Sequence, residues 1–140
     1  MQMEQESSPP WLTAEVARLL DAPNFAQLGT VDENGQPRID TVWLARQGAR
    51  LLVATTRRTR KARNLAMDAR AYIVVVNRDD PYEQVQLKVA LERMVDDADL
   101  RVCDAIAAKY IGGPFPVRHW PQRVALLFTV LDARYHHVRL

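Results

Sequence analysis

The sequence offers little from which a covalently cross-linked or metal-dependent site could be built. Cys103 is its only cysteine, which excludes an internal disulfide and a metal site made of several cysteines. We expect Cys103 to be a small buried hydrophobic residue, because its neighbours Val102 and Ile106 suggest the interior of a helix. His136 and His137 would point to opposite faces of a strand, so we expect no metal site there.

Long hydrophobic runs and an excess of one charge are also missing. The longest apolar stretches, 71–76 and 124–130, are far shorter than the roughly 20 residues that span a bilayer, so we expect no membrane partner. The first residues include Glu4 and Glu6 and no apolar segment, which is not the pattern of a secretory signal, and we expect a cytoplasmic protein. The net charge of +2 does not by itself indicate a nucleic-acid partner.

What the sequence does contain is the composition of one folded domain. Its 140 residues are 48% hydrophobic and 26% charged, and this length leaves room for a single core of ordinary size. The polar start of the chain ends in two consecutive prolines. We therefore predict a flexible tail over residues 1–10 and a single domain over residues 11–140.

Strand signals dominate that domain. Residues 25–31 and 39–45 flank an Asn-Gly turn at 32–35, a pattern typical of a β-hairpin. Further strands are predicted at 51–56, 71–76, 85–92, 123–131 and 135–140, and the unbroken apolar run 71–76 predicts a strand buried on both faces. Three helices are expected, near 13–21, within 56–67 and from about 96 to 111. Six or seven mainly antiparallel strands in so short a chain predict a small barrel with helices over its openings.

The segment 54–65 is the most informative for function. Thr55 and Thr56 end a strand and are followed by five cations, which are Arg57, Arg58, Arg60, Lys61 and Arg63. A helix N-terminus with hydroxyls and cations around it suits a phosphate monoester. Lys61 and Asn64 stand at i and i+3 and can face one ligand, while Leu65 anchors the helix to the core.

Two other interpretations of this segment stay open at this point. A run of charges usually belongs to a solvated helix face. Small barrels with basic loops can also bind single-stranded nucleic acid by stacking bases on aromatic side chains. No strand here alternates exposed aromatic and basic residues, so we expect no nucleic-acid partner.

The order of these motifs resembles the split-barrel flavin-binding superfamily. The similarity includes a strand, the turn Asn34-Gly35-Gln36-Pro37, a strand ending Thr41-Val42-Trp43, a strand ending Thr55-Thr56, then Lys61-x-x-Asn64-Leu65 and an apolar strand. Lys109-Tyr110-Ile111-Gly112-Gly113 before the apolar strand 123–131 adds to it. Within the superfamily the chain is similar to the pyridoxamine 5'-phosphate oxidase-like proteins and to relatives that use the deazaflavin coenzyme F-420.

This resemblance implies a homodimeric FMN-binding split barrel with cofactor sites at the subunit interface. The positions that would hold the cofactor phosphate are Thr55, Thr56, Lys61 and Asn64, with Arg60 as an addition. The positions that would lie along the ring are Thr41, Val42 and Trp43, and those that would approach it from the end of the strand 71–76 are Asn77 and Asp79.

The function that the resemblance implies is hydride transfer between FMN, or alternatively F-420, and a small organic substrate. The cofactor would perform the chemistry, and no catalytic acid or base can be named. The alternative is a non-catalytic flavin-binding protein that stores or senses its cofactor. Trp43 and Trp120 could contact a ring or could simply fill packed space. Residues 134–137 do not reproduce the basic residues of true pyridoxamine-phosphate oxidases, so we do not expect vitamin B6 oxidation.

Overall fold

The computed structural model describes residues 8–140. The helices are α1 (Ala14–Asp21), α2 (Arg60–Met67) and α3 (Arg101–Ile111). The strands are β1 (Ala26–Val31), β2 (Pro37–Val42), β3 (Ala45–Gln47), β4 (Arg50–Thr56), β5 (Arg70–Asn77), β6 (Asp80–Asp96) and β7 (Arg123–His137). Most of the tail predicted at residues 1–10 lies outside the described residues.

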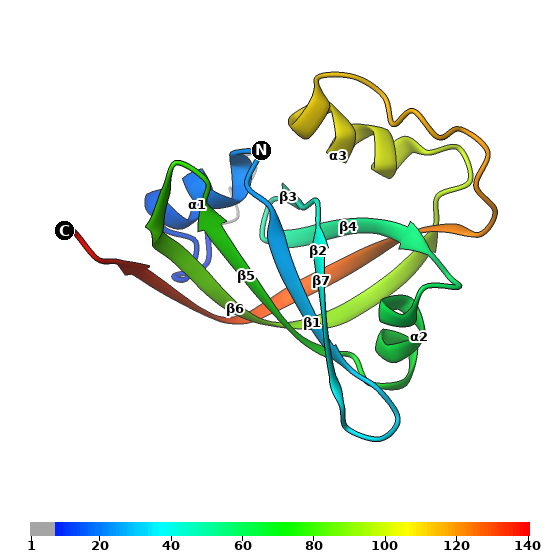
Figure 1. Cartoon of the computed structure of the whole chain (residues 1–140), viewed down its shortest axis with the longest axis horizontal. Coiled ribbons are helices and arrows are strands. Elements are labelled where there is room, and N and C mark those ends of the chain that lie inside the picture. The colour runs from blue at the N-terminus through cyan, green and yellow to red at the C-terminus, as the bar shows by residue number, and fades with distance from the viewer. Residues whose placement is uncertain (1–7) are drawn as a thin grey trace, which may run out of the picture.

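The strands form one sheet in the order β2-β1-β5-β6-β7-β4-β3, and every neighbouring pair is antiparallel. The prediction of a mainly β, antiparallel fold with flanking helices is therefore confirmed. The sheet curls so that its two ends approach each other around the core (Figure 1). This arrangement is consistent with a split barrel, with β2 and β3 as the terminal strands of the sheet.

The predicted Asn-Gly hairpin is present and joins β1 to β2. The Asp32 carboxylate accepts the backbone N–H groups of Asn34 and Gln36, both at 2.9 Å. Gly35 has a φ of +76°, which lies in the left-handed region where a side chain is disfavoured. The turn chemistry of four consecutive residues therefore fixes where the chain reverses.

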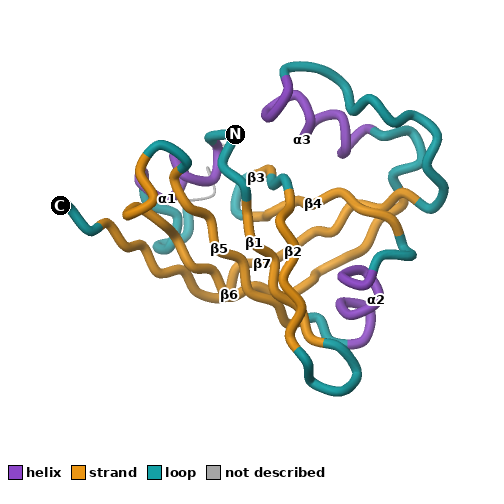
Figure 2. The backbone as a smooth tube through the Cα atoms, viewed as in Figure 1, coloured by secondary structure: helices purple, strands orange, loops and turns teal. Residues whose placement is uncertain are grey.

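The two longest strands, β6 and β7, hold both halves of the sheet together. They pair from Glu83 with His137 to Asp96 with Val124, with irregularities after Lys88 and after Leu91. Such bulges bend and twist a strand pair, and Figure 2 shows β6 and β7 sweeping across the whole molecule. We predicted separate strands at 123–131 and 135–140, but β7 continues from one region into the other.

The core lies inside the curve of the sheet. Its members are all apolar, and the largest fully buried ones include Phe128, Leu19, Leu20, Leu28, Leu44, Leu51, Leu65, Ile73, Leu87 and Leu126. On β5, Ile73 and Val75 are buried while Tyr72 is 40% exposed. The expectation that this strand is buried on both faces is therefore wrong for this chain by itself, because one face meets the core and the other does not.

The helices lie at different places around the sheet. Figure 1 shows α1 near the turn between β5 and β6 and α2 near the far end of β4, while α3 contacts β3 and β4. Thr13 caps α1 by accepting the N–H of Val16 at 3.3 Å, and α1 buries Val16, Leu19 and Leu20. Within residues 8–140, no helix has the length and apolar character needed to cross a membrane.

Candidate functional site

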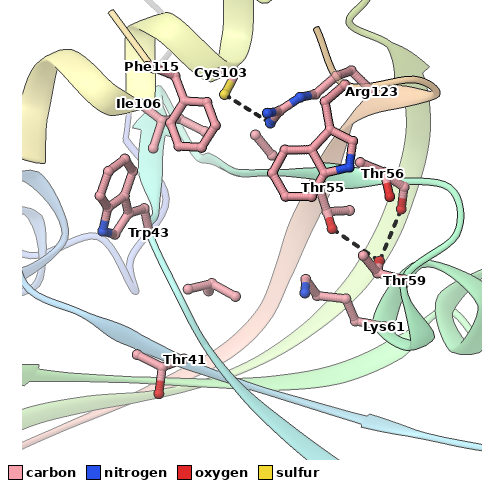
Figure 3. A pocket seen from close by; sticks show the side chains of 13 residues that line it. Thr41, Trp43, Thr55, Thr56, Thr59, Lys61, Cys103, Ile106, Phe115 and Arg123 are labelled. Carbon is pink, nitrogen blue, oxygen red and sulfur yellow. Dashed lines mark hydrogen bonds between the residues drawn. The ribbon is translucent and has the colours of Figure 1, made fainter. Parts of the chain in front are cut away.

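A pocket of about 330 Å³ lies where β2, β4, β7 and two of the helices meet. Its lining comes from segments far apart in the sequence, and its members are Thr41, Val42, Trp43, Ala54, Thr55, Thr56, Thr59, Lys61, Cys103, Ile106, Phe115, Trp120 and Arg123. Figure 3 shows these side chains around a shared space. Two of the lining residues are cationic and none is acidic, so the pocket favours an anionic ligand.

One end of the pocket is a group of threonines at the start of α2. Thr59 is the N-cap of the helix: its Oγ1 accepts the N–H of Ala62 at 3.4 Å and donates to the carbonyl of Thr56 at 3.0 Å. The hydroxyls of Thr55 and Thr59 are 3.0 Å apart. Thr55 and Thr56 are both more than nine-tenths buried. These hydrogen bonds of the threonine hydroxyls fix the start of α2 against the end of β4 (Figure 3).

Lys61 follows two positions after the cap and lines the same pocket. Among the residues that the structure describes, no hydrogen bond or ion pair holds its amine, which Figure 3 shows directed into the pocket. The first N–H groups of a helix have no acceptor within it, and they lie at the positive end of the helix dipole. The hydroxyls, the amine and the helix start together fit a phosphate group.

Arg60 and Asn64 lie on the same helix but do not line the pocket. The Arg60 guanidinium is 3.7 Å from the carboxylate of Glu33 in the β1–β2 turn. Asn64 is 1% exposed, and its amide donates to the hydroxyl of Thr30 at 3.1 Å. This differs from our expectation that Lys61 and Asn64 face one ligand, because the Asn64 side chain ties α2 to β1 instead.

Asn77 and Asp79 lie at the turn between β5 and β6, near α1 and away from α2 (Figure 1). The Asn77 amide donates to Glu83 at 2.8 Å, and its carbonyl oxygen accepts the N–H of Asp79 at 2.9 Å. Neither residue lines the pocket. In this chain Asn77 supports a buried carboxylate, and a contact of either residue with a cofactor stays a prediction.

The other end of the pocket is the end of β2. Val42 is buried, while Thr41 is exposed and donates its hydroxyl to Gln27 at 3.0 Å. Within the described sheet β2 pairs only with β1, so its outer edge presents backbone N–H and C=O groups without a strand partner. These groups are suited to hydrogen bonding with the edge of a heterocyclic ring.

Trp43 is held at this end by aromatic residues from the other side of the pocket. Its ring stacks on Tyr110 of α3, with centroids 5.1 Å apart and planes 5° apart, and it meets Phe115 edge-on at 6.0 Å. Tyr110 in turn accepts the N–H of Leu44 at 3.0 Å and donates to the carbonyl of Asn24 at 2.6 Å. The aromatic contacts therefore fix the orientation of Trp43.

Lys109, next to Tyr110 on α3, also binds the segment that follows β2. Its amine donates to the carbonyl of Leu44 at 2.6 Å and also to that of Leu20. Burial lowers the pKa of Lys109 to about 8. Lys109 and Tyr110, noted in the sequence for their position before the apolar strand, hold α3 against α1 and against the β2–β3 connection.

Sequence reasoning missed the part of the pocket that comes from residues beyond 100. Cys103 and Ile106 come from α3, Phe115 and Trp120 from the connection that follows it, and Arg123 from the first position of β7. Burial raises the pKa of the Cys103 thiol. The only local signal was Trp120, considered as a cap for a ring pocket. No local sequence signal pointed to Arg123. It reaches the site because β7 pairs with β4, which places Arg123 opposite Thr56.

The sheet, the helices and the pocket define a split-barrel class of protein, and comparison with known sequences identifies the family. The sequence pattern described as pyridoxamine 5'-phosphate oxidase matches residues 12–137. The chain therefore belongs to the pyridoxamine 5'-phosphate oxidase family, whose relatives include FMN-binding proteins. No match was found among curated proteins.

Solved structures show the same fold at low sequence identity. An F420 reductase is 24% identical with a TM-score of 0.78, over 84% of this chain and 94% of that one. A conserved hypothetical protein from Mycobacterium tuberculosis is 20% identical with a TM-score of 0.76, over 96% and 90%. A pyridoxamine 5'-phosphate oxidase-related, FMN-binding protein from Nostoc punctiforme is 19% identical with a TM-score of 0.65, over 91% and 83%.

Proposed function

We propose that this chain is a flavin-type oxidoreductase that transfers a hydride between FMN and a small organic substrate. The observation that carries the proposal is the pocket itself, with phosphate-binding groups at the start of α2 and an unpaired strand edge beside Trp43. Much of the remaining pocket lining is apolar, and an apolar surface suits a ring system. When bound, the cofactor supplies the hydride chemistry.

The residues of the chain have separate tasks in this proposal. Thr55, Thr56 and Lys61 hold the phosphate, with the start of α2 as a further donor. The edge of β2 hydrogen-bonds the polar side of the ring, and Trp43 limits where the ring can lie. No pocket residue is a carboxylate or a histidine, so we assign no general acid or base.

F-420 is the alternative cofactor, because it presents a phosphate to the same groups. Its polyglutamate tail would also need cations outside the pocket, such as Arg57 and Arg58. The Arg57 guanidinium is 2.7 Å from the carboxylate of Asp96, which engages one of the two. We therefore place FMN first. A domain over residues 11–140 and a cytoplasmic location are part of the same proposal.

We further propose that the protein acts as a homodimer. An apolar groove of about 490 Å³ crosses β1, β2 and β5, where Ile39 is 70% exposed and Tyr72 is 40% exposed. Exposed apolar surface of this kind is typical of a protein interface. The half-exposed outer face of β5 has the apolar composition of a buried strand, and a second subunit would cover it.

The substitution Lys61→Ala tests the proposed phosphate site. We expect it to weaken binding of FMN, or of F-420 if that is the cofactor, by about 10- to 100-fold, because a charge-assisted hydrogen bond contributes about 1.5–3 kcal/mol. The measurement is a fluorescence titration of ligand-free protein with each cofactor in parallel.

The matched control is Arg63→Ala, which removes the same charge from an exposed position on the same helix. Its affinity should stay within about twofold of that of the wild type, since exposed charges are screened. Equal losses in the two variants, or binding of neither cofactor by the wild type, would contradict the proposal. Tight binding without turnover of any electron acceptor would favour the non-catalytic alternative.

A further inference from the structure

Arg123 is a cation enclosed in the pocket wall without an anionic partner. It is 5% exposed, and its Nη1 donates to the sulfur of Cys103 at 3.3 Å. Its Nε and Nη2 are buried and have no hydrogen-bond acceptor among the described residues. Buried guanidinium groups are normally paired, because an unsatisfied buried donor is costly. These two nitrogens therefore need an acceptor that the folded chain does not supply.

The carboxylates near Arg123 are engaged elsewhere. Asp97 accepts the backbone N–H groups of Val102 and Cys103, both at 2.9 Å. Asp104 pairs with Arg118 at 2.7 Å. The Cys103 thiol does not neutralise Arg123 either, because burial raises its pKa and keeps it protonated. A neutral thiol is only a weak hydrogen-bond acceptor.

Two aromatic rings pack against the Arg123 guanidinium, and they leave two of its buried nitrogens without an acceptor. The Arg123 Cζ lies 4.7 Å from the Phe115 ring centroid and 4.6 Å from that of Trp120. Cation–π contacts stabilise the charge through the ring faces and use none of the N–H groups. Nε and Nη2 point to the same side of the planar group and form a fork that matches two oxygens of one anion.

We propose that Arg123 is the anion-binding residue for the substrate, and that the substrate is an organic carboxylate whose two oxygens lie against Nε and Nη2. A carboxylate is planar like the fork, and the pocket beside it is apolar, with Ile106 and Phe115 in its lining. The phosphate has its own donors at Lys61 and the threonines. This inference rests on the proposed function, since it assigns the substrate to the pocket that holds the cofactor.

Because Nε and Nη2 are buried, an anion reaches them only when a neighbouring group moves, and Trp120 is the exposed neighbour. Trp120 is 48% exposed and lies on the connection between α3 and β7. Figure 3 shows the guanidinium of Arg123 beside Cys103, on the same side of the pocket as Thr55 and Thr56. An exposed ring on a connection moves at a lower cost than a core ring. We therefore expect the Trp120 ring, which packs against the guanidinium, to shift when a carboxylate binds to Nε and Nη2.

The test compares benzoate with benzamide, which has the same shape and no charge. Calorimetry on wild-type protein, before and after saturation with FMN or F-420, should show benzoate binding. Arg123→Gln should weaken benzoate binding at least about tenfold and change benzamide binding by less than about twofold. Arg123→Lys keeps the charge without the fork and should recover only part of the loss. Thermal melting of each variant confirms that it is folded.

The cofactor titration separates this inference from the proposed function. Arg123→Gln should keep the flavin affinity of the wild type, and Lys61→Ala should keep its benzoate affinity. Benzoate binding that is absent, or that is equal in wild type and Arg123→Gln, would overturn the inference. A loss of FMN affinity in Arg123→Gln would also overturn it, because the oxyanion of Arg123 would then be the cofactor phosphate. Failure to bind either cofactor would contradict only the proposed function.

Discussion

Glu83 is a carboxylate held inside the protein by partners from three separate segments. It is 3% exposed and accepts hydrogen bonds from Arg18 of α1, Asn77 of β5 and Tyr135 of β7. A buried charge is tolerated only when it is paired and hydrogen-bonded. The hydrogen bonds from Arg18, Tyr135 and Asn77 lower the pKa of Glu83 to about 2.

This network makes stability depend on pH below neutrality. The pKa of Glu83 is about 2 in the folded protein against a reference of 4.5, so its contribution is complete above about pH 5 and is lost as the pH falls toward 2. Glu83→Gln should lower the free energy of unfolding at pH 7 by about 1–3 kcal/mol. Urea denaturation at several pH values should also give a flatter dependence between pH 5 and 2 for the variant. An unchanged pH profile would contradict this role.

Asn77 and Arg123 have hydrogen-bond partners and positions that could not be predicted from the residues next to them in the sequence. Asn77 follows an apolar strand in the sequence, and nothing within a few positions indicates that it bonds to Glu83. Arg123 likewise reads as the polar start of a strand. Both assignments depend on which strands pair, because β7 brings Arg123 opposite Thr56. Of the pocket residues named from sequence, Thr55, Thr56 and Lys61 belong to one short segment whose chemistry is local. Thr41, Val42 and Trp43 were named only through the family resemblance.

The start of α3 is an element that positions part of the pocket. Its N-cap, Leu100, has a φ of 63° and no side-chain cap. Asp97 replaces the cap, because its two carboxylate oxygens accept the N–H groups of Val102 and Cys103. Asp97 therefore supplies the cap that the Leu100 side chain cannot provide.

Asp97→Ala should lower the free energy of unfolding by about 1–2 kcal/mol, the usual cost of losing a helix cap. Hydrogen exchange should rise first in α3. Asp99→Ala is the matched control, since Asp99 is exposed and accepts, among the described residues, one N–H group, that of Arg101 at 3.2 Å. Chemical denaturation of both variants checks the prediction, and equal losses would mean that Asp97 has no special place at the helix start.

Element boundaries were predictable where turn chemistry is local and less so elsewhere. The turn after β1 was placed correctly by Asn34 and Gly35. The strand predicted over 85–92 is instead the central part of β6, which extends from Asp80 to Asp96. Its ends carry polar and charged residues that mask the strand pattern, and pairing with β7 supplies the hydrogen bonds that hold them in the sheet.

The described part of the chain has an exposed apolar surface, the groove across β1, β2 and β5, that the proposed dimer would bury. Composition predicted that 71–76 is covered on both faces, and the structure shows only one face against the core. Residues that a partner subunit buries are apolar, as core residues are. A strand at an interface therefore has the composition of a core strand.

Ile39→Glu should therefore convert the dimer to a monomer. Sedimentation equilibrium of the wild type should give twice the chain mass of 16.0 kDa, and the variant should give that mass itself, because a carboxylate cannot be buried in an apolar interface without a partner. Val138→Glu, at an exposed apolar position outside the groove, should remain dimeric. A monomeric wild type would contradict the proposed assembly.

We propose that the pocket at the start of α2 binds a cofactor through its phosphate. The most direct measurement compares the affinity of the wild-type protein for FMN with its affinity for riboflavin, and for F-420 with its phosphate-free deazariboflavin. We expect the phosphorylated form of one pair to bind at least about 100-fold more tightly, since several charge-assisted hydrogen bonds are added. Equal affinities within both pairs would contradict it.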